Sequence, residues 1–301
     1  MAVIIDGKKI AEKVLSEVKK EVAEMKRKGK EITLAVVLVG KDPASLVYVS
    51  SKEKKCAEIG INSEKIELAE NTSGEKLLSV VEKLNRDKKI NGILVQFPLP
   101  KQIEERKIRN AISPEKDVDG LNEKNMGKLA NGEEMLAPCT PKGVIRLLEE
   151  YGVNVSGKNA VVVGRSALVG KPLAQMLLNR NATVTICHSK TPKDEMEKYC
   201  KNADILCVAV GKPKMITEGM VKDGAVVIDI GITRLEGRTV REEAEGTEKI
   251  VRKNVLVGDV DFENVKRKAK LITPVPGGVG LMTIAMLMRN TLNAANMQNR
   301  G

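Results

Sequence analysis

The sequence predicts an α/β fold made of two α/β domains, on two observations. Short runs of apolar, often β-branched residues alternate with helical patterns along nearly the whole chain, which is typical of a parallel sheet covered by helices. The chain has 301 residues, 42% of them hydrophobic, which is enough for two domains with a core each. We expect an active-site crevice between these two domains.

In the first half of the chain, strand patterns alternate with longer helical patterns. The expected strands are 3–5, 32–39, 65–69 and 92–97, and the expected helices are 8–28, 43–59, 74–87 and a short one at 103–111. Asp42, Pro43 and Gly60 fit the N-cap, the first position and the C-cap of the second helix. A stretch rich in Pro, Gly and Asn follows the fourth strand, and we expect a domain boundary near its end, at 138–141.

A second alternation occupies the second half. The expected helices are 143–151, 171–179 and 193–201, and the expected strands are 160–163, 183–187, 205–210 and 225–230. Residues 237–253 are polar and charged, so we expect a surface excursion or hairpin there. A last helix at 281–296 has the apolar face to pack across the boundary onto the first half. The predicted domains are 1–140, joined by helix 279–298, and 141–278.

The charge pattern favours anionic small molecules over nucleic acid as partners. The net charge is +11, but basic and acidic residues are interleaved along the chain. Three Tyr and two Phe are few for stacking bases, and the chain has no Trp. We therefore expect no nucleic-acid partner.

The sequence predicts a soluble protein in a reducing compartment. No stretch is apolar enough to span a membrane, and the first residues lack the basic segment and apolar run of a signal peptide. We expect a cytoplasmic location and no membrane partner. The five cysteines are odd in number and never form Cys-x-x-Cys, which predicts reduced, mostly buried thiols.

A glycine-rich turn predicts a phosphate site in the second half. Gly164 follows a predicted strand, and Gly170 precedes a predicted helix that has Pro172 in its first turn. Such glycines let the backbone approach a pyrophosphate at a helix N-terminus. Ser166 replaces the second glycine of the usual pattern, and a plain strand-to-helix connection is the alternative. The second domain is thus expected to be a Rossmann-like, doubly wound parallel sheet.

The end of the next strand favours NADP over NAD. An NAD site of this type has an Asp or Glu about twenty residues after the turn, where this chain has His188, Ser189 and Lys190. Arg165, Ser189 and Lys190 can each donate a hydrogen bond to a 2′-phosphate, which a carboxylate would repel. We interpret His188 as a capping or packing residue beside the cofactor in preference to a catalytic base.

Three polar side chains share one face of the second predicted helix. Ser45, Tyr48 and Lys52 lie near its N-terminus, at the sheet edge where open α/β folds bind ligands. A partly buried lysine there has a lowered pKa and can act as base or proton donor, with Tyr48 as relay or packing surface. An exposed lysine is the ordinary alternative, for which Lys54 and Lys55 are better candidates.

Further polar residues are expected at the same sheet edge. Gln96 ends another strand and should point into the same crevice. Asp117 and Asp119 lie two residues apart, where an Asx-turn is the plain alternative to a functional role. No third ligand is near this pair in the sequence, so we predict no metal site.

Seven sequence blocks occur in an order that is more specific than any single motif. They are Asp42-Pro-Ala-Ser-Leu-Val-Tyr48-Val-Ser-Ser-Lys52, Gly92-Ile-Leu-Val-Gln96-Phe-Pro-Leu-Pro100, Lys116-Asp-Val-Asp-Gly-Leu121, Cys139-Thr-Pro-Lys-Gly143, Val163-Gly-Arg-Ser166, Thr185-Ile-Cys-His-Ser189 and Pro274-Val-Pro-Gly-Gly-Val-Gly280. Together they resemble the bifunctional methylenetetrahydrofolate dehydrogenase/methenyltetrahydrofolate cyclohydrolase family over nearly the whole chain. The chain departs from the family at Leu281, where a proline is usual, and in the longer excursion at 237–253.

The resemblance implies NADP-dependent oxidation of 5,10-methylenetetrahydrofolate to the methenyl cation, which is then hydrolysed to 10-formyltetrahydrofolate in the same crevice. The catalytic residues it implies are Lys52 at the centre, Tyr48 aligning the folate, Gln96 tuning Lys52 and Asp119 anchoring the pterin. The folate contacts it implies are Tyr48, Gln96, Asp119, Pro276 and Gly277. The NADP contacts it implies are Gly164, Arg165, Ser166, Ser189 and Ile232. A homodimer in one-carbon metabolism and purine biosynthesis is expected on the same ground.

Two other classes of protein fit the residues less well. Short-chain dehydrogenases also use Tyr-x-x-x-Lys with a serine, but there the glycine-rich turn comes first. Here Tyr48 precedes Gly164 by 116 residues. A non-catalytic basic binding module would explain the charge, but it would not explain a phosphate turn and a lysine crevice in one chain.

Overall fold

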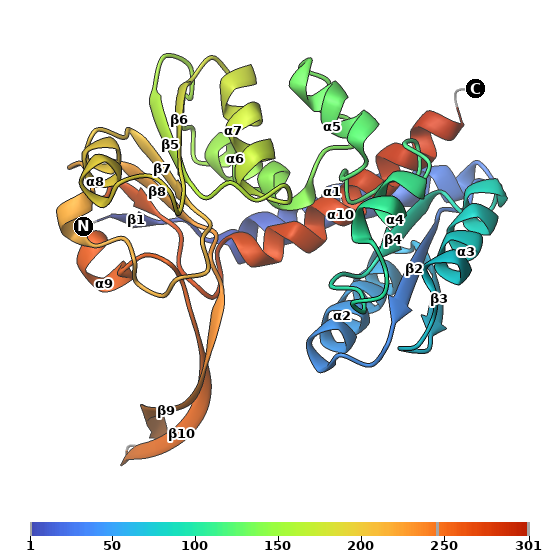
Figure 1. Ribbon diagram of the computed structural model, residues 1–301, viewed down its shortest axis with the longest axis horizontal. Coiled ribbons are helices and arrows are strands. Elements are labelled where there is room, and N and C mark those ends of the chain that lie inside the picture. The colour runs from blue at the N-terminus through green and yellow to red at the C-terminus, as the bar shows by residue number, and fades with distance from the viewer. Residues whose placement is uncertain (1, 245–246, 300–301) are drawn as a thin grey trace. The chain divides into compact units, whose positions relative to one another are not determined.

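The computed structural model describes residues 2–244 and 247–299, which form two compact α/β units (Figure 1). Unit 1 comprises Met1–Lys8 and Val144–Leu281, and unit 2 comprises Lys9–Gly143 and Met282–Gly301. The first eight residues thus lie with the second half of the chain, whereas the sequence places them with residues up to 140. The reason is a strand pairing between distant segments, which no local pattern contains.

Unit 2 contains a three-stranded parallel sheet in the order β3-β2-β4. The central strand β2 (Thr33–Val39) pairs with β3 (Asn62–Leu68) and β4 (Gly92–Val95). Six of the seven residues of β2 are buried, as a central strand covered on both faces requires. The edge strand β3 is mostly exposed, and its polar start explains why the sequence pattern locates only its second half.

Helices surround this sheet. They are α1 (Gly7–Arg27), α2 (Pro43–Ile59), α3 (Gly74–Arg86), α4 (Glu105–Ala111), α5 (Glu123–Ala130) and α10 (Val279–Gln298). The predicted ends of α2 are confirmed: the Asp42 side chain accepts from the Ser45 amide at 2.8 Å, and Gly60 takes the left-handed conformation with φ 85°. The short helix α5 is not predicted by the sequence pattern.

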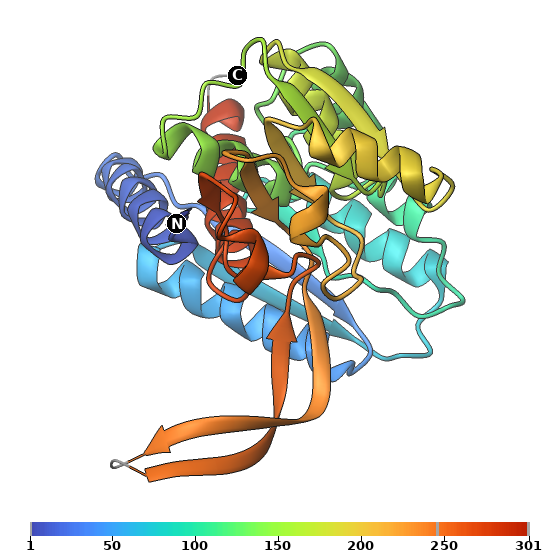
Figure 2. The same cartoon turned by 90° about the vertical axis from the view of Figure 1, so that its left-hand side faces the viewer.

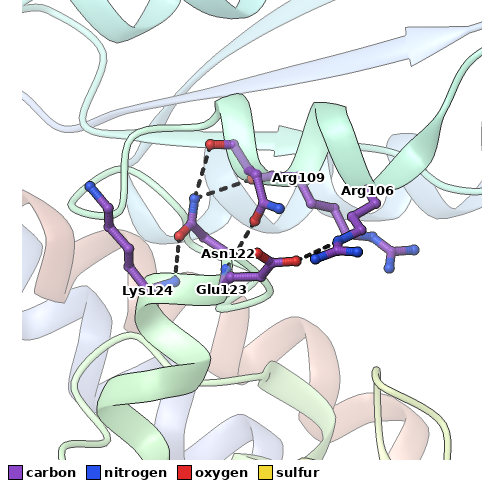
Figure 3. Close-up of polar contacts among 6 residues, drawn as sticks. Arg106, Arg109, Asn122, Glu123 and Lys124 are labelled. Atoms are coloured by element: carbon purple, nitrogen blue, oxygen red, sulfur yellow. Dashed lines mark hydrogen bonds and ion pairs between the residues drawn. The ribbon is translucent and has the colours of Figure 1, made fainter.

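Asn122 fixes the segment that joins α4 to α5 (Figure 3). Its side chain is buried; the amide nitrogen donates to the carbonyl of Ile112 at 2.9 Å, and the amide oxygen caps α5 by accepting from the Lys124 amide at 2.8 Å. The next residue, Glu123, pairs with Arg106 on α4 at 2.6 Å. One asparagine therefore ends one helix segment and starts the next.

The buried carboxylate of Asp117 organises the same loop. It accepts from the backbone amides of Gly120 at 3.1 Å and Asn122 at 2.8 Å, and from the side chain of Asn125 at 2.8 Å. Gly120 has φ 71°, and a side chain there would meet the Ala137 backbone. The turn interpretation thus applies to Asp117, and it leaves Asp119 free for another role.

Unit 1 contains a six-stranded parallel sheet in the order β1-β11-β8-β7-β5-β6. The strands are β1 (Val3–Ile4), β5 (Asn159–Val163), β6 (Thr183–Cys187), β7 (Ile205–Val208), β8 (Val226–Asp229) and β11 (Leu271–Ile272). The helices are α6 (Cys139–Glu150), of which residues 139–143 belong to unit 2, α7 (Gly170–Asn179), α8 (Lys193–Lys201), a 3-10 turn η1 (Glu218–Met220) and α9 (Phe262–Val265). The predicted α/β class with a doubly wound parallel sheet is confirmed.

A long hairpin, β9 (Thr233–Ala244) and β10 (Thr247–Val257), leaves the six-stranded sheet of unit 1 (Figure 1, Figure 2). Its strands are antiparallel, with a register shift between Lys253 and Val255. The excursion predicted at 237–253 is thus a hairpin, and its residues 245 and 246 lie outside the described part of the chain.

Two predictions from composition are tested directly. All five cysteines are free and buried, as predicted. Within residues 2–244 and 247–299, the structure has no helix with the length and apolarity that crossing a membrane requires.

Replacing Asn122 by Ala is expected to destabilise unit 2 by about 2 kcal/mol, because the buried carbonyl of Ile112 loses its donor and α5 loses its cap. Urea unfolding measures this change. The matched control is Asn131→Ala at the exposed end of α5, which we expect to change the free energy of unfolding by less than about 0.5 kcal/mol. Equal effects of the two substitutions would contradict this account of the loop.

Candidate active site

Lys52 and Gln96 meet in unit 2. The Lys52 ammonium on α2 donates to Oε1 of Gln96, just after β4, at 2.8 Å. The Gln96 amide nitrogen donates to the Phe97 carbonyl at 2.6 Å, so the side-chain oxygen is the atom turned toward Lys52. The backbone amide of Gln96 also continues the sheet by donating to the Val37 carbonyl. Lys52 is therefore held from a strand end, as expected of ligand sites in open α/β sheets.

Burial lowers the pKa of Lys52, while the negative charge of Asp119 acts in the opposite direction. The sequence predicts a lowered pKa for Lys52 from partial burial, and burial is the cause in the structure. The protonated and neutral forms of Lys52 are thus brought closer in free energy, which suits a group that moves protons.

Asp119 completes this cluster. Burial raises its pKa, and the charge of Lys52, a hydrogen bond from Cys139 and the charge of Arg109 each oppose the rise. The acid and the lysine therefore each favour the charged form of the other. Asp119 lies within the turn that Asp117 closes, and the hydrogen bonds of that turn fix the backbone from which the Asp119 side chain extends.

The shared face of α2 has three different environments. Ser45 is buried, with 3% of its surface exposed, Lys52 is half-buried, and Tyr48 is 52% exposed. The phenol of Tyr48 is thus available to a ligand, whereas Ser45 belongs to the helix start, where its amide donates to Asp42. Of the three residues that share this face, Lys52 is the one that the structure places against Gln96.

Sequence reasoning missed two residues beside the cluster. The guanidinium of Arg109 stacks over the ring of Phe97 at 4.6 Å and binds Glu105 at 2.7 Å. The Cys139 sulfur lies 3.3 Å from the Val118 carbonyl oxygen, next to Asp119. The contact of Arg109 with Phe97 has a signal in the sequence, because the chain has only two Phe and one of them directly follows Gln96.

The glycine-rich turn of unit 1 is tight for a steric reason. Gly164 has φ 133°, and a side chain there would come within 2.3 Å of the Ala209 carbonyl oxygen. A side chain at Gly170 would come within 2.2 Å of the Gly164 carbonyl oxygen. Ser166 closes the turn, since its hydroxyl oxygen accepts from the amides of Val169 and Gly170 at 3.1 and 3.4 Å. The Ser166 hydroxyl hydrogen remains to donate to an anion.

A cavity of about 410 Å³ opens beside this turn. Gly164, Arg165, His188, Ser189, Lys193 and Lys212 are among its lining residues. Among the described residues that line it there is no Asp or Glu, so the lining is basic. His188 serves the loop, because its Nδ1 accepts from the Lys190 amide at 3.1 Å and its carbonyl from the Thr191 amide at 2.8 Å. This matches the capping interpretation of His188.

The other predicted site residues also lie in unit 1. Ile232 follows β8, is 44% exposed and is absent from the residues that line this cavity. Pro276 is exposed after a cis peptide bond, and Gly277 is half-buried with φ 103°. The structure thus brings Lys52, Gln96 and Asp119 together in unit 2, and Gly164, Arg165 and Ser189 together in unit 1.

The described residues contain no group of three or more His, Cys, Asp or Glu that could hold a metal ion. Unit 1 combines a parallel sheet with a glycine-rich turn and a basic cavity, and unit 2 holds the cluster of Lys52, Gln96 and Asp119. These features place the protein in the class of nicotinamide-dependent α/β enzymes.

The comparisons with known proteins identify the family. Residues 5–119 match the catalytic domain of tetrahydrofolate dehydrogenase/cyclohydrolase, and residues 138–299 match the NAD(P)-binding domain of the same family. The chain belongs to the tetrahydrofolate dehydrogenase/cyclohydrolase family, as predicted.

Individual relatives match over almost their full length. The bifunctional protein FolD of Moorella thermoacetica is 54% identical, over 98% of this chain and 99% of its own. The bifunctional protein FolD of Acetivibrio thermocellus is 51% identical, over 99% of this chain and 98% of its own. Among the solved structures that match the whole of this chain is the Campylobacter jejuni enzyme FolD, a methylenetetrahydrofolate dehydrogenase/cyclohydrolase, with 45% identity, a TM-score of 0.90 and 100% of its own chain covered. Another is the Trypanosoma brucei FolD complexed with NADP and an inhibitor, with 37% identity, a TM-score of 0.91 and 99% of its own chain covered.

The pKa of Lys52 is expected to fall further in Asp119→Asn, because the carboxylate that favours the ammonium is neutralised. Titration of the lysine side chains by NMR measures this change. Asp87→Asn is the matched control, since the charge of Asp87 acts on Lys116. A Lys52 pKa that is the same in Asp119→Asn and the unmodified protein would separate the two residues.

Proposed function

We propose that the Lys52 cluster of unit 2 converts the folate and that the basic cavity of unit 1 binds NADP. The reactions are NADP-dependent oxidation of 5,10-methylenetetrahydrofolate to 5,10-methenyltetrahydrofolate and hydrolysis of the product to 10-formyltetrahydrofolate, the two activities of this family in one-carbon metabolism. The observation that carries the assignment of roles is the 2.8 Å contact of Lys52 with Gln96, beside Asp119.

The residues of unit 1 fit NADP. Gly164 lets the turn pass close to the Ala209 backbone, where any side chain would collide, and Arg165, Ser166 and Ser189 provide donors for the pyrophosphate and the 2′-phosphate. NADP, when bound, accepts the hydride from the methylene carbon. The exposed side chain of Ile232 is assigned to apolar contact with the cofactor.

Lys52 moves protons in the hydrolysis step. Water adds to the methenyl carbon, and the neutral amine of Lys52 accepts the proton that the attacking water loses. The bond between that carbon and N5 then breaks, the ammonium of Lys52 returns the proton to N5, and the hydroxyl of the adduct releases its proton to the solvent as it becomes the formyl carbonyl. Gln96 keeps the amine oriented by accepting one of its hydrogens throughout.

Asp119 and Tyr48 position the folate. The carboxylate of Asp119 can accept two hydrogen bonds from the amino-pyrimidine edge of the pterin, and Arg109 and Lys52 help to keep it ionised despite burial. The exposed ring of Tyr48 offers an apolar surface and a hydroxyl for alignment. We also assign Pro276 and Gly277, in the loop that precedes α10, to folate binding.

Family membership also supports a cytoplasmic homodimer whose product supplies purine biosynthesis. The interleaved charges and the few aromatic residues support small anionic partners, with neither nucleic acid nor membrane as a partner.

Lys52→Met is expected to separate the two reactions. It keeps most of the side-chain volume and removes the amine, so methenyl hydrolysis should fall by about 10²-fold or more while some NADP-dependent oxidation remains. The assay follows cofactor reduction and methenyl decay separately, and the methenyl intermediate should accumulate. Lys54→Met is the control, because Lys54 lies two residues further along the same helix and is exposed. Hydrolysis by Lys52→Met at the unmodified rate would remove Lys52 from the chemistry.

Arg165→Ala is expected to weaken NADP binding by about 1.5–3 kcal/mol, roughly a 10- to 150-fold rise in Kd, with a much smaller effect on NAD. Fluorescence titration with the reduced cofactors measures both affinities. Lys201→Met, at the exposed end of α8 in the same unit, is the control for a lost positive charge. Equal use of NAD and NADP by the unmodified enzyme would overturn the assignment of the 2′-phosphate site.

A further inference from the structure

One asparagine on the apolar helix α10 is fully buried. Asn290 has 0% of its surface exposed, and its neighbours Leu287, Met288 and Leu292 are buried as well. A polar amide in such a place is costly unless each of its groups has a partner. The partners of Asn290 therefore show what the amide holds.

The amide of Asn290 connects α10 to two segments that lie far earlier in the sequence, one at 118 and one at 137–142. Its nitrogen donates to the carbonyls of Val118 at 2.8 Å and Ala137 at 2.9 Å, and its oxygen accepts from the ammonium of Lys142 at 2.6 Å. Both hydrogens and the oxygen are thus used. All of these residues belong to unit 2, so the arrangement is internal to that unit.

The two carbonyls flank the backbone on which Asp119 stands. Val118 directly precedes Asp119, and the backbone of Ala137 presses against Gly120, where a side chain would come within 2.3 Å of the Ala137 carbonyl carbon. Asn290 therefore clamps the segment on both sides of Asp119. The Cys139 sulfur approaches the same Val118 carbonyl at 3.3 Å and adds to the clamp.

Lys142 fixes the orientation of the Asn290 amide. Its ammonium donates to the amide oxygen of Asn290 and, at 3.1 Å, to the Met135 carbonyl. Because an ammonium can only donate, the oxygen of Asn290 must face Lys142, and the nitrogen therefore points to Val118 and Ala137. A positive charge at the oxygen also strengthens the bonds that the nitrogen donates.

We propose that Asn290, oriented by Lys142, is a positioning residue that sets Asp119 for recognition of the folate. The inference rests on the proposed role of Asp119 as pterin anchor. A displaced Asp119 weakens folate binding and leaves the cofactor site of unit 1 unchanged. An asparagine that only packed the helix would not divide its effects between the two substrates.

The test compares Asn290→Asp with Asn293→Asp on the same helix. Asn290→Asp has the same shape, but an oxygen faces the two carbonyls, so the clamp opens. Asn293 is partly exposed and makes only a 3.4 Å contact to the Met135 carbonyl among its described side-chain bonds, and it serves as the control. Steady-state kinetics of the dehydrogenase give KM for methylenetetrahydrofolate and for NADP, and titration with reduced NADP confirms an intact unit 1.

We expect Asn290→Asp to raise KM for methylenetetrahydrofolate about tenfold or more, to change KM for NADP less than twofold, and Asn293→Asp to change neither. Combined with Asp119→Ala, which itself should damage both activities, Asn290→Asp should add less than a threefold further effect, because it acts through the residue already removed. Lys142→Met should show the same division between the substrates at about threefold.

The following results would overturn the inference. Equal losses for folate and NADP would make Asn290 a purely structural residue, and full additivity with Asp119→Ala would disconnect the two. An unchanged folate KM in Asn290→Asp, with Asp119→Ala impaired, would refute the inference alone; an unchanged folate KM in Asp119→Ala would refute the pterin anchor and the inference with it. If Asn290→Asp does not fold, Lys142→Met decides, and an unchanged folate KM there counts against the proposal.

Discussion

The burial of opposite charges at Lys52 and Asp119 is the constraint on which the arrangement of unit 2 depends. Burial disfavours the ammonium of Lys52 and the carboxylate of Asp119, and each is favoured by the other. Such a pair is stable only where hydrogen bonds complete it, and Gln96 and Cys139 supply them. The end of β4, the helix α2 and the turn that begins at Asp117 are therefore all needed to hold the side chains of Lys52 and Asp119 together.

Unit 1 uses buried carboxylates in a different way, to hold the loops that follow its strands. Asp259 accepts from the amides of Val210 and Gly211 at 2.7 and 3.0 Å, and Val210 lines the basic cavity. Asp229 at the end of β8 accepts from the amides of Asp259 and Val260, and its burial raises its pKa to about 7. Backbone amides thus donate to one oxygen of Asp259 and to both oxygens of Asp229 inside this unit, and the basic lining is left to anions.

The sequence predicts most of the fold because many of the determinants are local. Asp42 and Gly60 mark both ends of α2 by capping chemistry that the neighbouring residues alone decide. The two failures that concern strands have a common cause in pairing between distant segments. β1 joins the sheet of unit 1 by pairing Val3 with Leu271, and the polar edge strand β3 is ordered by β2 rather than by its own pattern.

The site shows the same division between local and distant determinants. Lys52 and Gln96 are predicted because each occupies a helix start or a strand end, positions that a parallel sheet gathers at one edge. Asn290 is missed, since its contact with Val118 spans 172 residues and its helix is apolar by pattern. An amide on an apolar helix face is nevertheless a usable signal. Because a buried amide needs hydrogen-bond partners, an asparagine on the apolar face of a helix indicates that the helix binds polar groups of another segment, here the carbonyls of Val118 and Ala137.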